Sequence, residues 1–287
     1  MENRPTKDAD SEAMKCAICK TGHTRQDSHI IPKLVYRWLK KTSPTGYFRG
    51  TANPNVRRQD GEKIKLLCPK CEDAFSKLET EFANRIFHPV HTGGRTDHEF
   101  EYEEWFHRFA VSISWRTLYF LCKKGGMGGV LFGQEEHFVA ALETWRSYLN
   151  GEQDDLGQHV QHLIVMDSII SSEGIENDFD TNLYIHRGVD FNTIHSPTET
   201  YIFAKLGLIL ICGVIVNDVA LPNGGWARTE VVRAGGSYRK GDFAVSPCTF
   251  KFLQTGIDEM RAGREKISEK QIQAMNQTFF KRYGIRI

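Results

Sequence analysis

The chain has 287 residues, enough for one large domain or two modest ones with a proper hydrophobic core. Hydrophobic residues make up 40% of it, charged residues 25%, and the net charge is +1. This composition is that of an ordinary soluble globular protein, and it excludes a chain that is basic throughout, as a general polyanion binder would be.

Positive charge is nevertheless concentrated in one stretch. Residues 25–70 contain eleven lysines and arginines against three acidic residues, a local net charge of +8. A phosphate backbone is a natural partner for such a stretch. A solvated basic loop is the simpler alternative, and the sequence leaves both open.

Two Cys-x-x-Cys pairs stand at the two ends of this region. Thiolates two residues apart can reach one ion from a tight turn, so the two pairs together predict a tetrahedral, structural zinc site. The alternative is two chance pairs of buried or disulfide-bonded cysteines. The expected ligands are Cys16, Cys19, Cys68 and Cys71.

The remaining cysteines and the hydropathy pattern indicate the cellular compartment of the protein. Cys122, Cys212 and Cys248 stand in apolar surroundings, as reduced, buried thiols do. The first fifteen residues are polar and charged, and the longest apolar run, residues 206–216, is well short of the ~20 residues of a membrane span. We therefore expect a cytoplasmic protein with no membrane association.

Short elements are expected around the cysteine pairs. Residues 25–31 have the pattern of a short strand that carries His29, and Pro32 starts a helix. Residues 42–61 are a turn-rich, basic excursion, and residues 62–67 form a second strand. Cys68-Pro69 then opens a helix, because proline suits a first helical turn.

The rest of the chain is expected to change from helices to strands. A linker at 88–97 precedes helices over about 99–123 and 134–149. Strands are expected at 160–166, 183–186, 200–202 and 206–216, with further candidates at 229–233 and 243–245. Two helices close the chain, at 247–261 after the cap residue Ser246 and at 269–282 after Ser268.

These elements predict an α+β fold in three parts. Residues 1–90 form a zinc-binding module, residues 91–150 a helical segment, and residues 151–287 a mixed α/β domain with a largely antiparallel sheet. Nothing in residues 151–287 identifies a ligand, so a protein partner or an oligomer contact is the role left open for that domain.

The order of the motifs resembles a known family. Cys-x-x-Cys, then His29-Ile30-Ile31-Pro32, then Leu-Leu-Cys-x-x-Cys is similar to the HNH endonuclease superfamily, whose ββα-metal core in this subtype is braced by a treble-clef zinc. The resemblance covers about residues 15–82. It implies that His29 is the general base that deprotonates a water for attack on a phosphodiester. It also implies a catalytic divalent ion, here Mg²⁺ or Mn²⁺, beside a zinc ion that is purely structural.

The chain departs from the family pattern at three positions. Ser28 stands where the family has a metal-binding aspartate, and Asp27 points to the other face of a regular strand from position 28 unless a bulge turns it. Lys63 stands where an asparagine orients the histidine. Glu72 replaces the histidine or asparagine that follows the last cysteine. With Glu79, seven residues further on the same helix face, it would rebuild the metal site.

Each assigned residue also has a simpler explanation. His29 can be a buried histidine that hydrogen-bonds its own hairpin, Glu72 can complement a helix N-terminus, and Glu79 can be a solvated helix residue. Three further histidines, His88, His91 and His98, cluster in the expected linker, where loop histidines are the simpler interpretation than a metal site. The candidate phosphate contacts, each of which can be mere surface charge, are Lys33, Arg37, Arg57 and Arg58.

Three functions are therefore weighed. The first is a metal-dependent nuclease that hydrolyses DNA, a module that bacterial defence systems join to unrelated domains. The second is a catalytically degenerate zinc module that binds nucleic acid or a protein partner without cleavage, which the missing aspartate and asparagine favour. The third is a small-molecule or partner site in the C-terminal sheet. We predict the first, with DNA as the partner.

Overall fold

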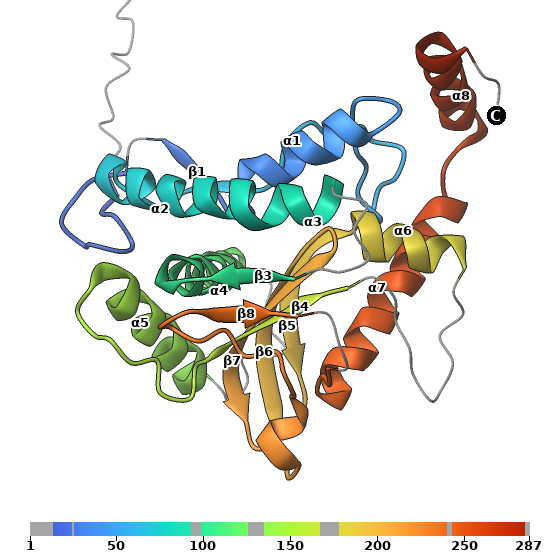
Figure 1. The fold of residues 1–287 in the computed structure, drawn as a ribbon. Helices are drawn as coiled ribbons and strands as arrows, with labels where there is room; N and C mark the ends of the chain where they lie inside the picture. The colour runs from blue at the N-terminus through green and yellow to red at the C-terminus, as the bar shows by residue number, and fades with distance from the viewer. Residues whose placement is uncertain are drawn as a thin grey trace, which may run out of the picture.

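The computed structural model describes residues 14–24, 26–92, 99–125, 135–166, 178–239 and 243–284 (Figure 1). These residues form a mixed α and β structure in which each pair of neighbouring strands is antiparallel. One four-stranded sheet and two two-stranded sheets are packed among helices in the described part of the chain. The α+β fold class with a largely antiparallel sheet is confirmed.

The first motif lies on a pair of short strands. β1 (Asp27–His29) pairs antiparallel with β2 (Lys63–Lys65), so that His29 lies opposite Lys63 and Asp27 opposite Lys65. The register is regular, without the bulge that would turn Asp27. The excursion between the strands is closed by an isolated bridge between Phe48 and Arg58. Two helices complete this region within two residues of their expected starts, α1 (Lys33–Thr42) and α2 (Pro69–Phe82).

The expectation of a linker at residues 88–97 was wrong for its first half. α2 continues through a π-helical turn, η1 (Ala83–Phe87), into α3 (His88–Thr92), which makes one almost continuous helical rod (Figure 1). The amide of Leu208 donates to Nε2 of His91 at 3.0 Å, so Nδ1 carries the proton that is shared with the carbonyl of Phe87 at 2.7 Å. His91 thus joins α3 to the sheet, and His98 lies outside the described residues.

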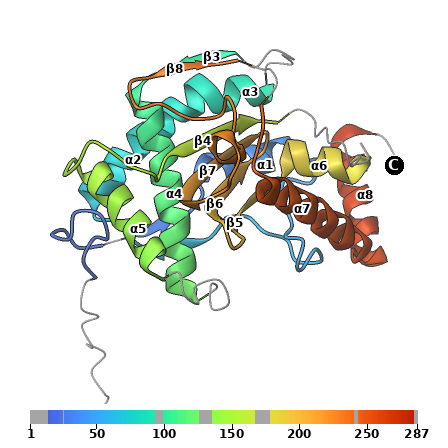
Figure 2. The ribbon, with the colours of Figure 1, turned by 90° about the horizontal axis from the view of Figure 1, so that it is seen from below.

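The central helix is α4 (Glu104–Lys124), which is buried on all sides along most of its length. A helix that is buried all round is typical of the interior of a larger protein. It contacts α2 on one side, and α5 (Glu135–Asn150) and the large sheet on the others (Figure 2). The residues just before it differ from the predicted helix, because β3 (Phe100–Tyr102) is extended and pairs with β8 (Gly236–Tyr238).

The large sheet has the strand order β4-β7-β6-β5. The apolar run at 206–216, expected as a single strand, is split by a tight turn at Gly207, whose φ of +67° suits glycine. The strand predicted at 160–166 is present, but β5 was not predicted. The bounds are β4 (Gln161–Val165), β5 (Val189–His195), β6 (Glu199–Leu206) and β7 (Ile209–Asn217).

The strand predicted at residues 183–186 was wrong, because these residues belong to the helix α6 (Phe179–Arg187). Asp178 caps this helix by accepting a hydrogen bond from the amide of Thr181 at 2.7 Å. Tyr184 and Ile185 are apolar because they are buried in α6, which packs beside α7 (Pro247–Glu265) in Figure 2.

The last two helices begin where the sequence predicted. The hydroxyl of Ser246 accepts from the amide of Thr249 at 3.2 Å and caps α7. Ser268 precedes α8 (Glu269–Tyr283) without a side-chain cap.

A single-turn 3₁₀ helix, η2 (Pro222–Gly225), follows β7. Residues 229–233 and 243–245 contribute isolated bridges rather than strands. None of the described helices is long and apolar enough to cross a membrane.

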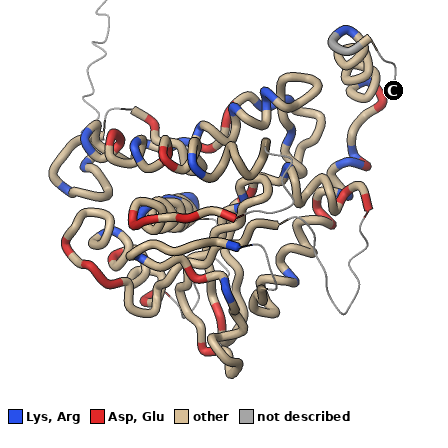
Figure 3. The backbone as a smooth tube through the Cα atoms, viewed as in Figure 1, with Lys and Arg blue, Asp and Glu red and all other residues tan. Residues whose placement is uncertain are grey.

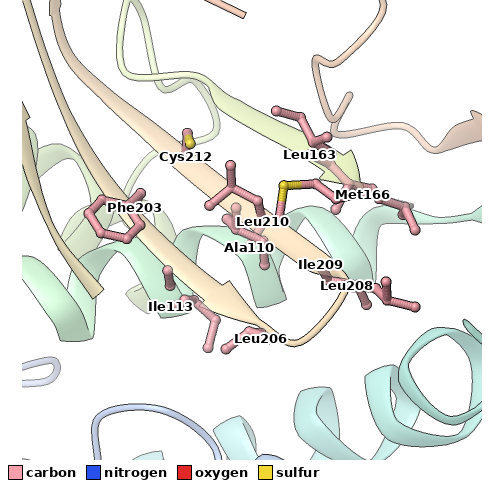
Figure 4. Close-up of a cluster of buried hydrophobic side chains, with 14 of the residues drawn as sticks. Ala110, Ile113, Leu163, Met166, Phe203, Leu206, Leu208, Ile209, Leu210 and Cys212 are labelled. Atoms are coloured by element: carbon pink, nitrogen blue, oxygen red, sulfur yellow. The ribbon is translucent and has the colours of Figure 1, made fainter. Parts of the chain in front are cut away.

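Two hydrophobic clusters join the three predicted parts of the chain. The larger one packs α1 and the α2–α3 rod against α4 and the large sheet, with Ala110 and Ile113 of α4 facing Phe203 and Leu210 (Figure 4). The smaller one packs Cys16, Leu66 and Phe75 against α4 and α5. The cysteine-rich region, residues 14–82, therefore packs against α4, a buried helix that lies outside this region. This packing holds the cysteine site in place.

Candidate metal centre and the surroundings of His29

The four predicted cysteine ligands come together at one point. All four Sγ atoms lie within 4.8 Å of one another, and those of Cys19 and Cys68 are 3.8 Å apart. Sulfurs at the corners of a tetrahedron with Zn–S bonds of about 2.3 Å are about 3.8 Å apart, so the donor set has the size that a zinc ion needs. In the described part of the chain, this is the one group of three or more potential metal ligands.

Tight backbone turns bring the sulfurs together. The amide of Lys20 donates to the carbonyl of Cys16 at 3.0 Å, and the amide of Ala17 donates to Leu66 at 2.9 Å, which ties the first turn to the strand before the second pair. At Gly22 a Cβ would lie 2.7 Å from Cβ of Cys68, so only glycine fits against the site. The turn from Cys16 to Lys20 is local, so the Cys-x-x-Cys spacing could predict it, whereas the contacts with Leu66 and Cys68 join the two cysteine pairs across the excursion between them.

The thiols are electrostatically distinct. Burial raises the pKa of Cys16, and burial together with the charge of Cys16 raises that of Cys71. Burial also opposes ionisation of Cys19, but hydrogen bonds from the Thr21 hydroxyl and the Gly22 amide outweigh it and lower the pKa to about 6. Four thiolates this close repel one another, so a bound cation is what makes all four charged forms compatible.

His29 is held by an aspartate that the sequence did not reveal as its partner. Its Nε2 lies 2.9 Å from Oδ1 of Asp60, and the other oxygen of Asp60 accepts from Nζ of Lys63 at 2.9 Å. The imidazole is 17% exposed and Asp60 33% exposed. Burial opposes the charge of Asp60, but the hydrogen bonds from Lys63 and His29 outweigh it and hold its pKa well below the usual value. Asp60 is therefore a fixed anion beside a partly accessible imidazole.

Glu72 lies beside the strand that carries His29. The hydroxyl of Ser28 donates to Oε2 of Glu72 at 2.7 Å, and Ser28 is buried. Position 28 and the first turn of α2 are thus in contact. Oε1 of Glu72 has no hydrogen-bond partner among the described residues, which leaves one carboxylate oxygen for another ligand.

Glu79 makes an ion pair that the sequence did not predict. Its Oε1 lies 2.6 Å from Nη1 of Arg116, whose side chain is only 3% exposed. The same nitrogen donates to the carbonyl of His29 at 3.2 Å, and Nε donates to the carbonyl of Ser112 at 3.3 Å. Glu79 therefore neutralises a buried arginine that braces the end of β1, and among the described residues no group of potential metal ligands includes Glu79.

The four candidate phosphate contacts are all exposed. Lys33 and Arg37 stand one turn apart on the outer face of α1, and neither has an ion-pair partner in the described part of the chain. Arg57 lies over the ring of Tyr47 at 4.7 Å, and Arg58 is 3.8 Å from Glu62. Figure 3 shows basic residues, coloured blue, recurring along α1 and the excursion that follows it.

Sequence reasoning missed two residues that contact His29. Asp60 stands three residues before Lys63, which pairs with His29. A prediction of this pairing would have placed Asp60 near the imidazole. Arg116 lies on α4 and carries no local signal, because its partners are separated from it by 37 and 87 residues.

The comparisons with known proteins add no relative. No protein-family model matches this chain, and no curated protein or solved structure matches it either. The resemblance to HNH endonucleases is therefore an expectation from the motif residues of the sequence.

Proposed function

We propose that this protein is a metal-dependent nuclease of the HNH type, which hydrolyses phosphodiester bonds of DNA with His29 as the general base. The observation that carries the proposal is the pair of His29 and Asp60 at the end of β1. His29 lies on the strand that follows the first cysteine pair, on the face of the hairpin that bears Lys63 and Lys65. An oriented, partly exposed imidazole among cations is what attack on a phosphodiester requires.

The contact with Asp60 sets the state of the imidazole. A carboxylate only accepts hydrogen bonds, so Nε2 of His29 carries the hydrogen and Nδ1 carries the lone pair. In the described part of the chain Nδ1 has no hydrogen-bond partner. Nδ1 takes the proton from an attacking water, and the charge of Asp60 stabilises the imidazolium that forms. Lys63 and the bond from Arg116 to the carbonyl of His29 keep the ring in place.

The structural and the catalytic metal ion would be held by separate residues. Cys16, Cys19, Cys68 and Cys71 would hold a structural zinc ion in the manner of a treble clef. Glu72 is the residue that would hold the catalytic divalent ion, because Mg²⁺ is commonly held by one or two carboxylates together with substrate phosphate and water. Glu72 contacts Ser28, whose side chain points to the opposite face of β1 from His29, so the ion and the base would approach a phosphate from the two sides of the strand end. When bound there, such an ion supplies positive charge to the scissile phosphate.

A second candidate is a module that binds nucleic acid without cleaving it. It is favoured by the ion pair between Glu79 and Arg116, which leaves Glu72 as the one of the two predicted carboxylates that is not paired with Arg116. The two candidates share the zinc site and the basic surface of Lys33, Arg37, Arg57 and Arg58. They differ only in whether a bound strand is hydrolysed.

Plasmid nicking by the full chain tests the proposal. In Mg²⁺ or Mn²⁺ the natural protein is expected to nick supercoiled DNA, and His29→Ala to lower the rate about 10²–10⁴-fold, because the general base is lost. Asp60→Asn removes the charge but keeps a hydrogen-bond acceptor, so we expect a smaller loss. The matched control is His88→Ala, an exposed histidine of α3, which should nick at the natural rate.

The outcomes separate the two candidates. Nicking that survives His29→Ala contradicts the assigned base. A natural protein that binds the plasmid but does not nick it with either ion is the binding module. Each variant is compared at equal zinc content, so that a loss of folding is not counted as a loss of catalysis.

A further inference from the structure

A cavity outside the residues discussed so far opens where β2 meets the end of α4. Its volume is about 350 Å³, and apolar, aromatic and basic residues line it. Consecutive residues of a strand point to opposite faces, yet both Ile64 and Lys65 line the cavity, so it lies along the open edge of β2. The lining residues are Met14, Ile64, Lys65, Tyr119, Lys123 and Lys124.

We propose that this cavity binds one nucleotide of the nucleic acid strand held at His29, with the base against Tyr119 and the neighbouring phosphates on the lysines. The proposal rests on the nucleic-acid binding in the proposed function, and it adds a contact from α4 that the cysteine-rich region lacks. Base stacking on an aromatic ring combined with lysines along the backbone is the general way in which proteins hold single strands.

Charge favours a polyanion as the occupant. Lys65, Lys123 and Lys124 form no ion pair with an acidic residue in the described part of the chain. Nζ of Lys123 lies 5.8 Å from the ring centre of Tyr119, and that of Lys124 lies 5.6 Å from Phe120. Lysines in a last helical turn also offset the helix dipole, but Lys65 comes from a strand and needs another explanation.

Position links the cavity to His29. Asp27 pairs with Lys65 and His29 pairs with Lys63, so His29 and Lys65 lie on the same face of the strand pair, on neighbouring strands. Diagonal neighbours of this kind are about 7–8 Å apart. Nζ of Lys63 is held by Asp60, so Lys65 is the next cation along the face that is available to a phosphate. A strand that reaches His29 is therefore close to Lys65, which lines the cavity.

Fluorescence anisotropy of a labelled single-stranded oligonucleotide tests the proposal. The His29→Ala protein is used throughout, so that binding is measured without cleavage. The double variant Lys123→Gln/Lys124→Gln is expected to bind about ten-fold more weakly. The slope of log K against log salt should fall by about 1.4, since each lost phosphate contact on a single strand contributes about 0.7. Tyr119→Leu, which keeps the charge, should weaken binding at least about five-fold.

The matched control is Lys251→Gln/Lys270→Gln, which removes the same charge from exposed positions on α7 and α8. If the two double variants bind alike, the cavity is not a nucleotide site. Equal loss of binding to poly-glutamate would also overturn it, because the lysines would then be a general anion patch. Neither result bears on nicking by the natural protein, so failure of the cavity and failure of the proposed function are told apart.

Discussion

Cys71→Ser is expected to remove the metal and to unfold the cysteine-rich region. A structural zinc site contributes about 10–16 kcal/mol in small zinc modules at neutral pH, because the unfolded chain has no preformed site. Here the second cysteine pair also anchors Leu66, Leu67 and Phe75 in the cluster against α4 and α5. We therefore expect the free energy of unfolding to fall by more than about 4 kcal/mol, beyond the usual range of single substitutions. Urea unfolding and metal analysis of the purified protein measure both effects.

The matched control for this substitution is Cys122→Ser. Cys122 is a free, partly buried thiol on α4 that is not part of the four-cysteine group. Its replacement should keep one zinc ion per chain and cost no more than about 1–2 kcal/mol. If Cys71→Ser retains a full equivalent of metal and matches the control in stability, the four sulfurs do not form a metal site.

Arg116→Met is expected to destabilise the protein by about 3 kcal/mol. The substitution removes a guanidinium that is 3% exposed and leaves the carboxylate of Glu79, 23% exposed, without its cation. Removing one partner of a buried ion pair lowers the free energy of unfolding by about 3–5 kcal/mol. The partial exposure of Glu79 puts this case at the lower end. The carbonyls of His29 and Ser112 lose their donor as well. Urea unfolding at neutral pH measures the change.

Arg85→Met is the control for the buried arginine. Arg85 is 40% exposed and pairs with Glu81 and Glu103 at the surface, where such pairs are worth at most about 1 kcal/mol. If the two substitutions cost the same, then Arg116 is not the brace that joins α4 to β1.

Local chemistry explains what the sequence predicted well. The Cys-x-x-Cys spacing required two tight turns, Pro69 marked the start of α2, and Ser246 marked the start of α7. Each of these signals lies within a few residues of the structure that it predicts. The strand pair that carries His29 followed in the same way, from short apolar alternation next to turn residues.

Tertiary context explains what the sequence did not predict. β5 is an edge strand with mostly half-exposed residues, so it lacks the apolar run that identifies a buried strand. The run in α6 was mistaken for a strand because its cap, Asp178, lies five residues upstream. The partner of Glu79 could not be found from the sequence, because Arg116 reaches it from a helix that is remote along the chain.

Rescue by imidazole tests the role of His29 most directly. In the His29→Gly protein, added imidazole can occupy the space of the missing ring beside Asp60. If His29 supplies only the base, the nicking rate of this variant in Mg²⁺ or Mn²⁺ should rise with imidazole concentration and saturate, while the natural protein is unaffected. A zinc-loaded, folded His29→Gly protein whose nicking rate does not respond to imidazole would contradict the assignment of the ring as the group that takes the proton from water.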